Sequence, residues 1–171
     1  MSLAEKLKKC FEEGTRNDER HQGLKKTKPN KQKALEHLAK AKHNLRALIV
    51  FHDVGFSDWS ASAAFYALYQ GLLAILAQQG YESKNQSCTF ALIEKFIEER
   101  TCTLLTKKDV KYIFDKDVTK NLEESEKLLD IREQMQYETK TKLAEAEFQM
   151  LKEQTKEIFD RISQEIESNL T

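Results

Sequence analysis

The chain has 171 residues, of which 40% are hydrophobic and 33% are charged, with 28 basic and 28 acidic side chains. This length and composition suit a single folded domain and exclude a disordered chain or a membrane bundle. Only five glycines and one proline are present, which is too few for the many turns of an all-β fold. The balanced charge hides an asymmetry, because residues 1–50 carry 13 basic and 6 acidic side chains (net +7) and residues 51–171 carry 15 and 22 (net −7).

The cysteines and the N-terminal residues indicate the cellular compartment of the protein. Cys10, Cys88 and Cys102 are an odd number and have no Cys-x-x-Cys spacing. This pattern predicts neither a disulfide framework nor a four-cysteine zinc site, so we expect free thiols in a reducing compartment. Residues 1–13 are charged throughout and contain no apolar core of a signal peptide. We therefore expect a cytoplasmic protein.

The first third of the chain predicts two helices. Apolar residues at intervals of three and four indicate a short amphipathic helix over 3–13. Residues 14–30 contain two glycines and the only proline and predict an exposed basic connector. Asn30 is a suitable N-cap for a helix over 31–53, which ends before Gly55.

The middle of the chain contains an uncharged stretch from Trp59 to Tyr81, long enough to cross a membrane. It holds two serines, three glutamines and many alanines, and no Lys/Arg boundary flanks it. We expect a buried bundle helix over about 58–79, capped by Ser57 and stopped at Gly80, with no membrane span. Residues 83–86 (SKNQ) fit a capping box that opens the next helix.

Helical spacing continues to the end of the chain. Residues 106–109 offer a further helix start, and one or two helices are predicted from there to about 137. From 141 to 169 the spacing predicts a long amphipathic helix. The predicted fold is all-α, with an antiparallel bundle of about five helices over 31–171, and a short extra N-terminal helix and connector over 1–30.

Motifs for common catalytic and cofactor sites are absent from the sequence. No Gly-rich phosphate-binding string, no His-Glu-x-x-His and no Glu-x-x-His pair occurs. The last three of the four histidines lie six and nine residues apart, unlike the spacing of three or four in a helical metal pair. The sequence therefore predicts no metal site and no cofactor. The histidines are His21, His37, His43 and His52.

Five segments follow one another in a distinctive order: LEHLAKAKHNLRAL, GFSDWS, SAAFYALYQGLLAILAQQGY, ESKNQS and LLDIREQMQYET. This order, over roughly residues 34–165, resembles the HEPN domain (higher-eukaryote and prokaryote nucleotide-binding), especially its small stand-alone bacterial and archaeal members. The resemblance implies a dimerising bundle of four or five helices. It also implies one of three functions: metal-independent RNA cleavage, nucleotide binding, or partnership with a minimal nucleotidyltransferase in a toxin–antitoxin pair.

The resemblance extends to single residues. Phe65-Tyr66-Ala67 matches the family's aromatic pair followed by alanine, and Gly80-Tyr81 matches its glycine turn. Lys84 matches the lysine of the following loop, and Arg132 matches the arginine of the late helix. In the nucleases of the family, a histidine follows this arginine after four to six residues. The corresponding positions here are held by Tyr137, Glu138 and Thr139.

The missing histidine has a direct chemical consequence. Imidazole transfers protons near neutral pH, whereas the ordinary pKa of a tyrosine is about 10. Arg132 alone can hold a phosphate but cannot supply the proton transfer that RNA cleavage requires.

We therefore expect a non-enzymatic, dimeric HEPN-type domain that binds a protein partner, with a minimal nucleotidyltransferase as the implied class. The final and N-terminal helices are the expected dimer surface. Two alternatives stay open: a degenerate metal-independent ribonuclease using Arg132 and Tyr137, and a purely structural interaction module. The candidate contacts to a nucleotide or RNA phosphate are Arg132, Lys84, Asn85, Gln86 and Tyr66.

Overall fold

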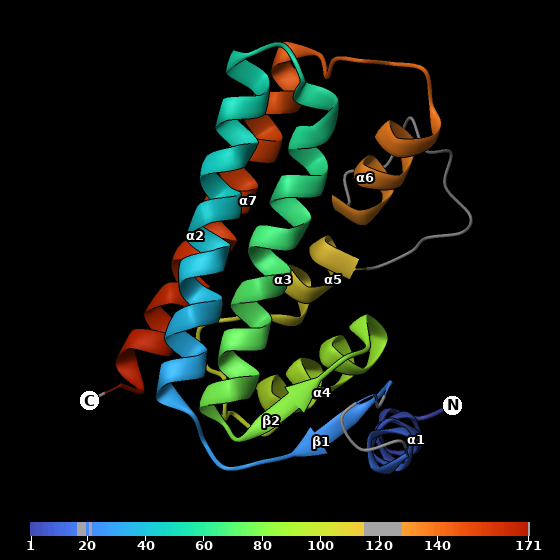
Figure 1. The fold of residues 1–171 in the computed structure, drawn as a ribbon, viewed down its shortest axis with the longest axis vertical. Coiled ribbons are helices and arrows are strands. Elements are labelled where there is room, and N and C mark those ends of the chain that lie inside the picture. The colour runs from blue at the N-terminus through green and yellow to red at the C-terminus, as the bar shows by residue number, and fades with distance from the viewer. Residues whose placement is uncertain (17–19, 21, 115–127, 171) are drawn as a thin grey trace.

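The chain folds into helices with one very small antiparallel sheet (Figure 1). The computed structural model describes residues 1–16, 20, 22–114 and 128–170. The all-α prediction is confirmed. The elements are α1 (Leu3–Thr15), β1 (Leu24–Lys26), α2 (Lys31–Asp53), the short 3-10 helix η2 (Ser57–Trp59), α3 (Ser60–Gln78), β2 (Tyr81–Ser83), α4 (Gln86–Glu98), α5 (Lys107–Phe114), α6 (Leu128–Tyr137) and α7 (Glu145–Ser168).

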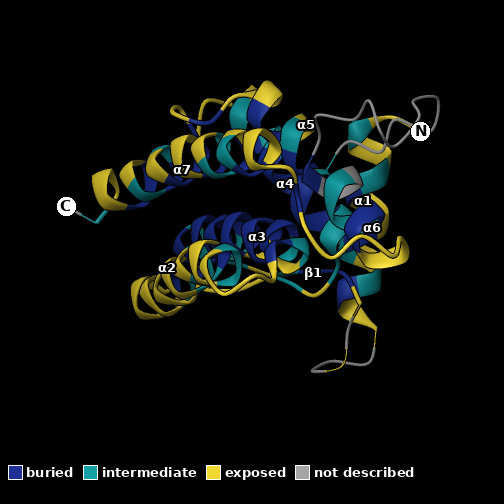
Figure 2. Cartoon of the chain, turned by 90° about the horizontal axis from the view of Figure 1, so that it is seen from above, coloured by how far each residue is buried: buried dark blue, intermediate teal, exposed yellow. Residues whose placement is uncertain are grey.

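The long helices α2, α3 and α7 form the centre of the fold, with α3 between the other two (Figure 2). The uncharged sequence of α3 explains this position, because 15 of its 19 residues are buried. Among the described residues, the stretch Ser57–Gln78 is the one helical segment long and apolar enough to cross a membrane, and 78% of the 18-residue window that meets this criterion is buried inside the fold. The prediction of a buried bundle helix is confirmed.

The directions of the long helices depart from a fully antiparallel bundle. His52 at the end of α2 contacts Glu145 at the start of α7, with Nε2 and Oε2 2.8 Å apart. At the other end, the Gln78 side-chain amide of α3 donates to the carbonyl of Ile166 in α7 at 2.9 Å. Thus α2 is antiparallel to both neighbours, whereas α3 and α7 run in the same direction. The chain from α6 crosses the upper end of the bundle before α7 begins (Figure 1).

The predicted exposed connector over residues 14–30 is partly wrong. Leu24 in β1 is buried and pairs with Ser83 in β2, so the connector is tied to the base of the bundle. Gly14 and Gly23 are also buried, and a Cβ atom on either would collide with backbone where α1 meets β1. A strand of three residues is too short to produce a recognisable alternation in the sequence.

The cysteine prediction is wrong for two of the three residues. Cys10 of α1 and Cys88 of α4 form a disulfide, with Cα atoms 5.7 Å apart and a sequence separation of 78. Cys102 is free and buried. Burial, with the nearby Glu165 carboxylate, raises the pKa of its thiol to about 12, so it is no thiolate nucleophile at neutral pH. The cysteines therefore no longer argue for a reducing compartment.

Two of the expected helix caps have other roles. The Ser57 hydroxyl accepts a hydrogen bond from the backbone N–H of Leu143 at 2.8 Å, so it fixes the entry to α7 and does not cap α3. The N-cap of α4 is Asn85, whose side chain accepts from the N–H of Cys88 at 3.0 Å. Ser83, the expected cap, instead accepts from a threonine hydroxyl within α4.

Three further boundary signals are confirmed. The Asn30 side chain accepts from the N–H of Lys33 at 2.9 Å and caps α2. Gly80 ends α3 with a φ of +80°, a conformation that disfavours side chains with a Cβ. Thr106 and Asp109 cap each other at the start of α5, because each side chain accepts from the backbone N–H of the other.

Candidate functional site

The sequence-predicted site residues lie at two separate positions. Arg132 of α6 meets Tyr66 on α3. Lys84, Asn85 and Gln86 follow β2, beyond the other end of α3. Because Tyr66 is 12 residues from the end of α3, the two positions are about 18 Å apart along the helix. The structure therefore does not unite all the candidates in one site.

Arg132 packs on aromatic rings. Its guanidinium carbon lies 4.4 Å from the ring centroid of Phe65 and 5.8 Å from that of Tyr66. Its Nε is buried and has no hydrogen-bond partner among the described residues. A guanidinium over aromatic faces gains cation–π attraction together with apolar packing of its stem. This arrangement fixes α6 against α3.

Tyr137 lies away from this guanidinium. Five helical positions separate Arg132 and Tyr137, which places them about 140° apart around the axis of α6. Tyr137 is 85% exposed. Among the described residues, no hydrogen bond joins a histidine to Arg132 either, and His52 stacks on Phe148 of α7 and pairs with Glu145.

Metal chemistry finds no support in the described ranges. No group of three or more His, Cys, Asp or Glu side chains there is arranged to hold a metal ion. The His37 Nδ1 bonds to the Gln70 side-chain oxygen at 2.8 Å. The fourth histidine, His21, lies outside the described residues.

Lys84, at the second of the two positions, borders a cavity of about 590 Å³ between the start of α2, the end of α3 and β2. We call this cavity the basic groove. Its floor is apolar and is formed by Leu73, Leu76 and Ala77 of α3. The basic side chains of the lining are Lys28, Lys33, His37 and Lys84. With one acidic side chain, Glu82, and with the histidine neutral, the lining has a formal charge of +2.

Backbone hydrogen bonds hold the walls of the basic groove together. The N–H of Thr27 donates to the carbonyl of Gly80 at 2.8 Å, and the N–H of Asn30 donates to Ala77 at 2.9 Å. On the β2 side, the N–H of Lys84 donates to the carbonyl of Gly23 at 3.1 Å. The basic groove is therefore built on fixed backbone. The N-terminal end of α2, which carries a partial positive charge, forms part of its wall.

Of the predicted phosphate contacts, Lys84 is the one that lines the basic groove, and its Nζ lies 3.5 Å from a Glu82 oxygen. Asn85 is occupied as a helix cap, and Gln86 is the first residue of α4. Sequence reasoning did not place Lys28 or Lys33 in a site, although the excess of lysines before α2 was visible. The missing information was the pairing of β1 with β2, which brings this segment beside Lys84.

The chain was compared with models of known protein families and with curated proteins, and neither comparison finds a match. The resemblance to the HEPN domain therefore rests on the order of the sequence segments and on the residues that carry it.

Proposed function

We propose that this chain is a non-catalytic helical domain that binds a phosphate-bearing ligand, a nucleotide or a short RNA, in the basic groove. The single observation that supports this proposal is the concentration of basic side chains over an apolar floor in one cavity. Nucleotide binding is also one of the functions that the HEPN resemblance implies.

The chemistry of the basic groove suits a phosphate ester. Lys28, Lys33 and Lys84 reach it from three different segments and offer ammonium donors to phosphate oxygens. The adjacent N-terminus of α2 also favours an anion. The apolar floor suits the less polar part of a nucleotide, and 590 Å³ is within the range of about 300–1,000 Å³ typical of small-molecule sites.

The surroundings of Arg132 disfavour RNA cleavage. Its guanidinium lies against two rings of α3, while Tyr137 is exposed on another side of α6. A general base must lie within hydrogen-bond reach of the proton that it removes. The pair Arg132 and Tyr137 does not offer this geometry, which disfavours the ribonuclease alternative.

Titration of the purified protein with labelled ATP, GTP and a short single-stranded RNA tests the proposal. We expect saturable binding that weakens as salt rises from about 50 to 200 mM, because phosphate contacts release counterions. Replacing Lys28 and Lys84 together by alanine removes two of these contacts and is expected to weaken binding by about fivefold or more.

The matched control is the double variant Lys140→Ala/Lys156→Ala. Lys140 pairs with Glu138 two positions before it, as Lys84 pairs with Glu82, and Lys156 is exposed on α7. An equal loss of ligand affinity in the two double variants would contradict the proposal. Cleavage of the RNA by wild type, lost in Arg132→Ala, would establish the ribonuclease alternative in its place. Absence of any binding would favour the purely structural module.

We also propose self-association through apolar side chains at the α2–α3 turn. The expected dimer stripe on α7 is buried against its own chain, as Phe148 and Ile162 show. Exposed apolar side chains gather instead where α2 ends and α3 begins, and such clusters commonly mark interfaces. This apical patch consists of Val50, Val54, Phe56 and Trp59, each more than half exposed.

Measurement of the molar mass in solution tests self-association. We expect a dimer for wild type and a monomer for Val54→Lys/Phe56→Lys, because two charges would be buried in the interface. A Lys substitution at the exposed Leu35, near the other end of α2 from the apical patch, is the control. A monomeric wild type would refute self-association. A nucleotidyltransferase gene beside the gene for this chain would support the partner class that the HEPN resemblance implies.

A further inference from the structure

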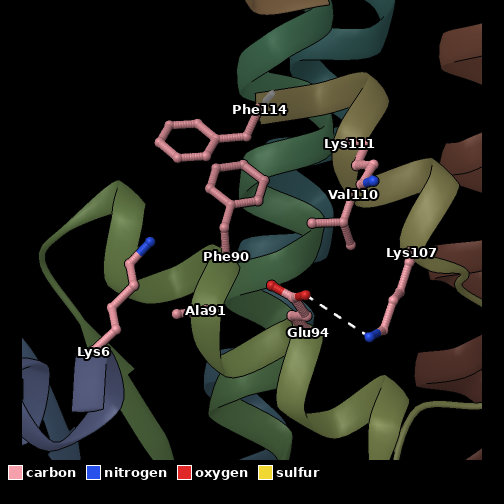
Figure 3. Close-up of a pocket in the computed structure, with 8 residues that line it drawn as sticks. All are labelled: Lys6, Phe90, Ala91, Glu94, Lys107, Val110, Lys111 and Phe114. Atoms are coloured by element: carbon pink, nitrogen blue, oxygen red, sulfur yellow. Dashed lines mark ion pairs between the residues drawn. The ribbon is translucent and has the colours of Figure 1, made fainter. Parts of the chain in front are cut away.

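A smaller cavity of about 210 Å³ lies where α1, α4 and α5 meet, and it shares no lining residue with the basic groove (Figure 3). One wall is aromatic. The rings of Phe90 and Phe114 are stacked with centroids 4.1 Å apart and planes 8° apart, and Ala91 and Val110 extend this apolar surface. Phe114 is half-buried, so its ring is partly open to the cavity.

Three lysines surround this apolar wall. In Figure 3, Lys6 of α1 approaches from one side, and Lys107 and Lys111 of α5 lie on the other. Lys107 is engaged by Glu98 at 2.6 Å and by Glu94 at 3.9 Å. Lys6 and Lys111 have no acidic partner among the described residues. With Glu94 as its one acidic residue, the lining has a formal charge of +2.

The walls of this cavity are joined covalently. The disulfide between Cys10 and Cys88 connects α1, which carries Lys6, to α4, which carries Phe90. An ammonium group and an aromatic surface are thereby held at a restricted separation before any ligand arrives. Such restriction reduces the entropy that binding must cost.

We infer that this cavity binds a small aromatic carboxylate. An aromatic ring of the ligand extends the Phe90–Phe114 stack, since aromatic rings favour offset or tilted contact with other rings. The carboxylate lies between Lys6 and Lys111 and supplies the negative charge that these two lysines lack among the described residues. The volume of about 210 Å³ lies below the range of about 300–1,000 Å³ typical of sites for drug-sized ligands, which suits one ring with a short acidic side chain better than a nucleotide.

The test is a ¹⁹F NMR titration of the intact, oxidised protein with 4-fluorophenylacetate. We expect a saturable change of the ligand signal below about 10 mM. The uncharged 4-fluorophenylacetamide has the same ring and is expected to bind much more weakly. The double variant Lys6→Gln/Lys111→Gln is expected to weaken binding of the carboxylate by about five- to thirtyfold.

The matched control is Lys8→Gln/Lys108→Gln, which removes the same charge from exposed positions of the same two helices. We expect this variant to bind as wild type does. The inference would be overturned if the amide bound as tightly as the carboxylate, or if the two double variants lost affinity for the carboxylate equally. It would also be overturned if no saturable signal appeared. Binding of nucleotide in the basic groove is a separate measurement, so failure of either proposal leaves the other intact.

Discussion

His52 links the ends of two long helices through a charge-dependent contact. Its ring stacks on Phe148 at a centroid distance of 3.7 Å, and its nitrogens face the carboxylates of Glu145 and Asp53. The hydrogen bond with Glu145 raises the pKa of His52 above its ordinary value, with a smaller contribution from Asp53 and against the opposing effect of burial. The protonated ring therefore holds α2 against α7 more firmly than the neutral ring does.

This contact predicts a pH-dependent stability. A raised pKa in the folded state gives a contribution that is fully present below the unfolded value of about 6.5 and is lost as pH rises through the folded value. We expect Glu145→Gln to lower the unfolding temperature more at about pH 5.5 than at about pH 8.5.

The control for this prediction is Glu147→Gln, which removes a carboxylate from the same turn of α7 without a histidine partner. Its effect should change much less between the two pH values. A Glu145→Gln effect that is the same at both pH values, or larger at the higher one, would contradict the assigned role of His52.

Family resemblance selected candidate site residues one at a time and did not show which of them meet in the folded chain. Lys84 was singled out because it matches the lysine of the family's loop after the glycine turn, and in the structure it lines the basic groove. Lys28 and Lys33 lie more than 50 positions earlier, and tertiary contacts, the β1–β2 pairing and the Asn30–Ala77 backbone bond among them, bring them to the same cavity. Arg132 was selected by family resemblance, but its contact with the faces of Phe65 and Tyr66 depends on how α6 docks on α3.

Among the helices, α1 is held to α4 by the disulfide between Cys10 and Cys88. α1 lies at the lower edge of the fold and touches α4 and β1 (Figure 1). Its apolar face buries Leu7 and Cys10, a small area for a helix of 13 residues. The cross-link to Cys88 closes a loop of 78 residues, and a disulfide of this span stabilises a fold by restricting the unfolded chain.

Removal of the cross-link is therefore expected to be costly. The variant Cys10→Ser/Cys88→Ser should lose about 2–4 kcal/mol in free energy of unfolding. Thiol titration of the unfolded protein gives an independent check, because one free thiol is expected without reductant and three are expected with it. Three thiols without reductant would refute the cross-link, and unchanged stability of the double variant would contradict its role.

Helix boundaries were predictable wherever a cap or a break was local. The bounds of α2 follow from Asn30 at one end and Gly55 just beyond the other, together with continuous apolar spacing. Ser57 was misassigned because its bond to Leu143 joins residues 86 positions apart, which no local pattern reveals. The same reason hid the parallel course of α3 and α7, since their relative direction depends on the return of the chain after α6.

In the molecule as a whole, the two ends of the α2–α3 pair carry different surfaces. The apical patch lies where α2 turns into α3, and the basic groove lies at the opposite end of α3 beside the β1–β2 pair. This separation allows a second subunit at one end and a phosphate ligand at the other without competition. We therefore propose self-association and ligand binding at distinct surfaces of the molecule.

Ligand binding in the basic groove is tested by mapping backbone amide shifts when ATP or a short RNA is added to isotope-labelled protein. We expect the changes to concentrate at residues 27–37, 73–77 and 81–84, around the basic groove, while residues 131–137 around Arg132 stay unchanged. Changes concentrated on α6 and the facing part of α3, with the basic groove unaffected, would refute binding in the basic groove.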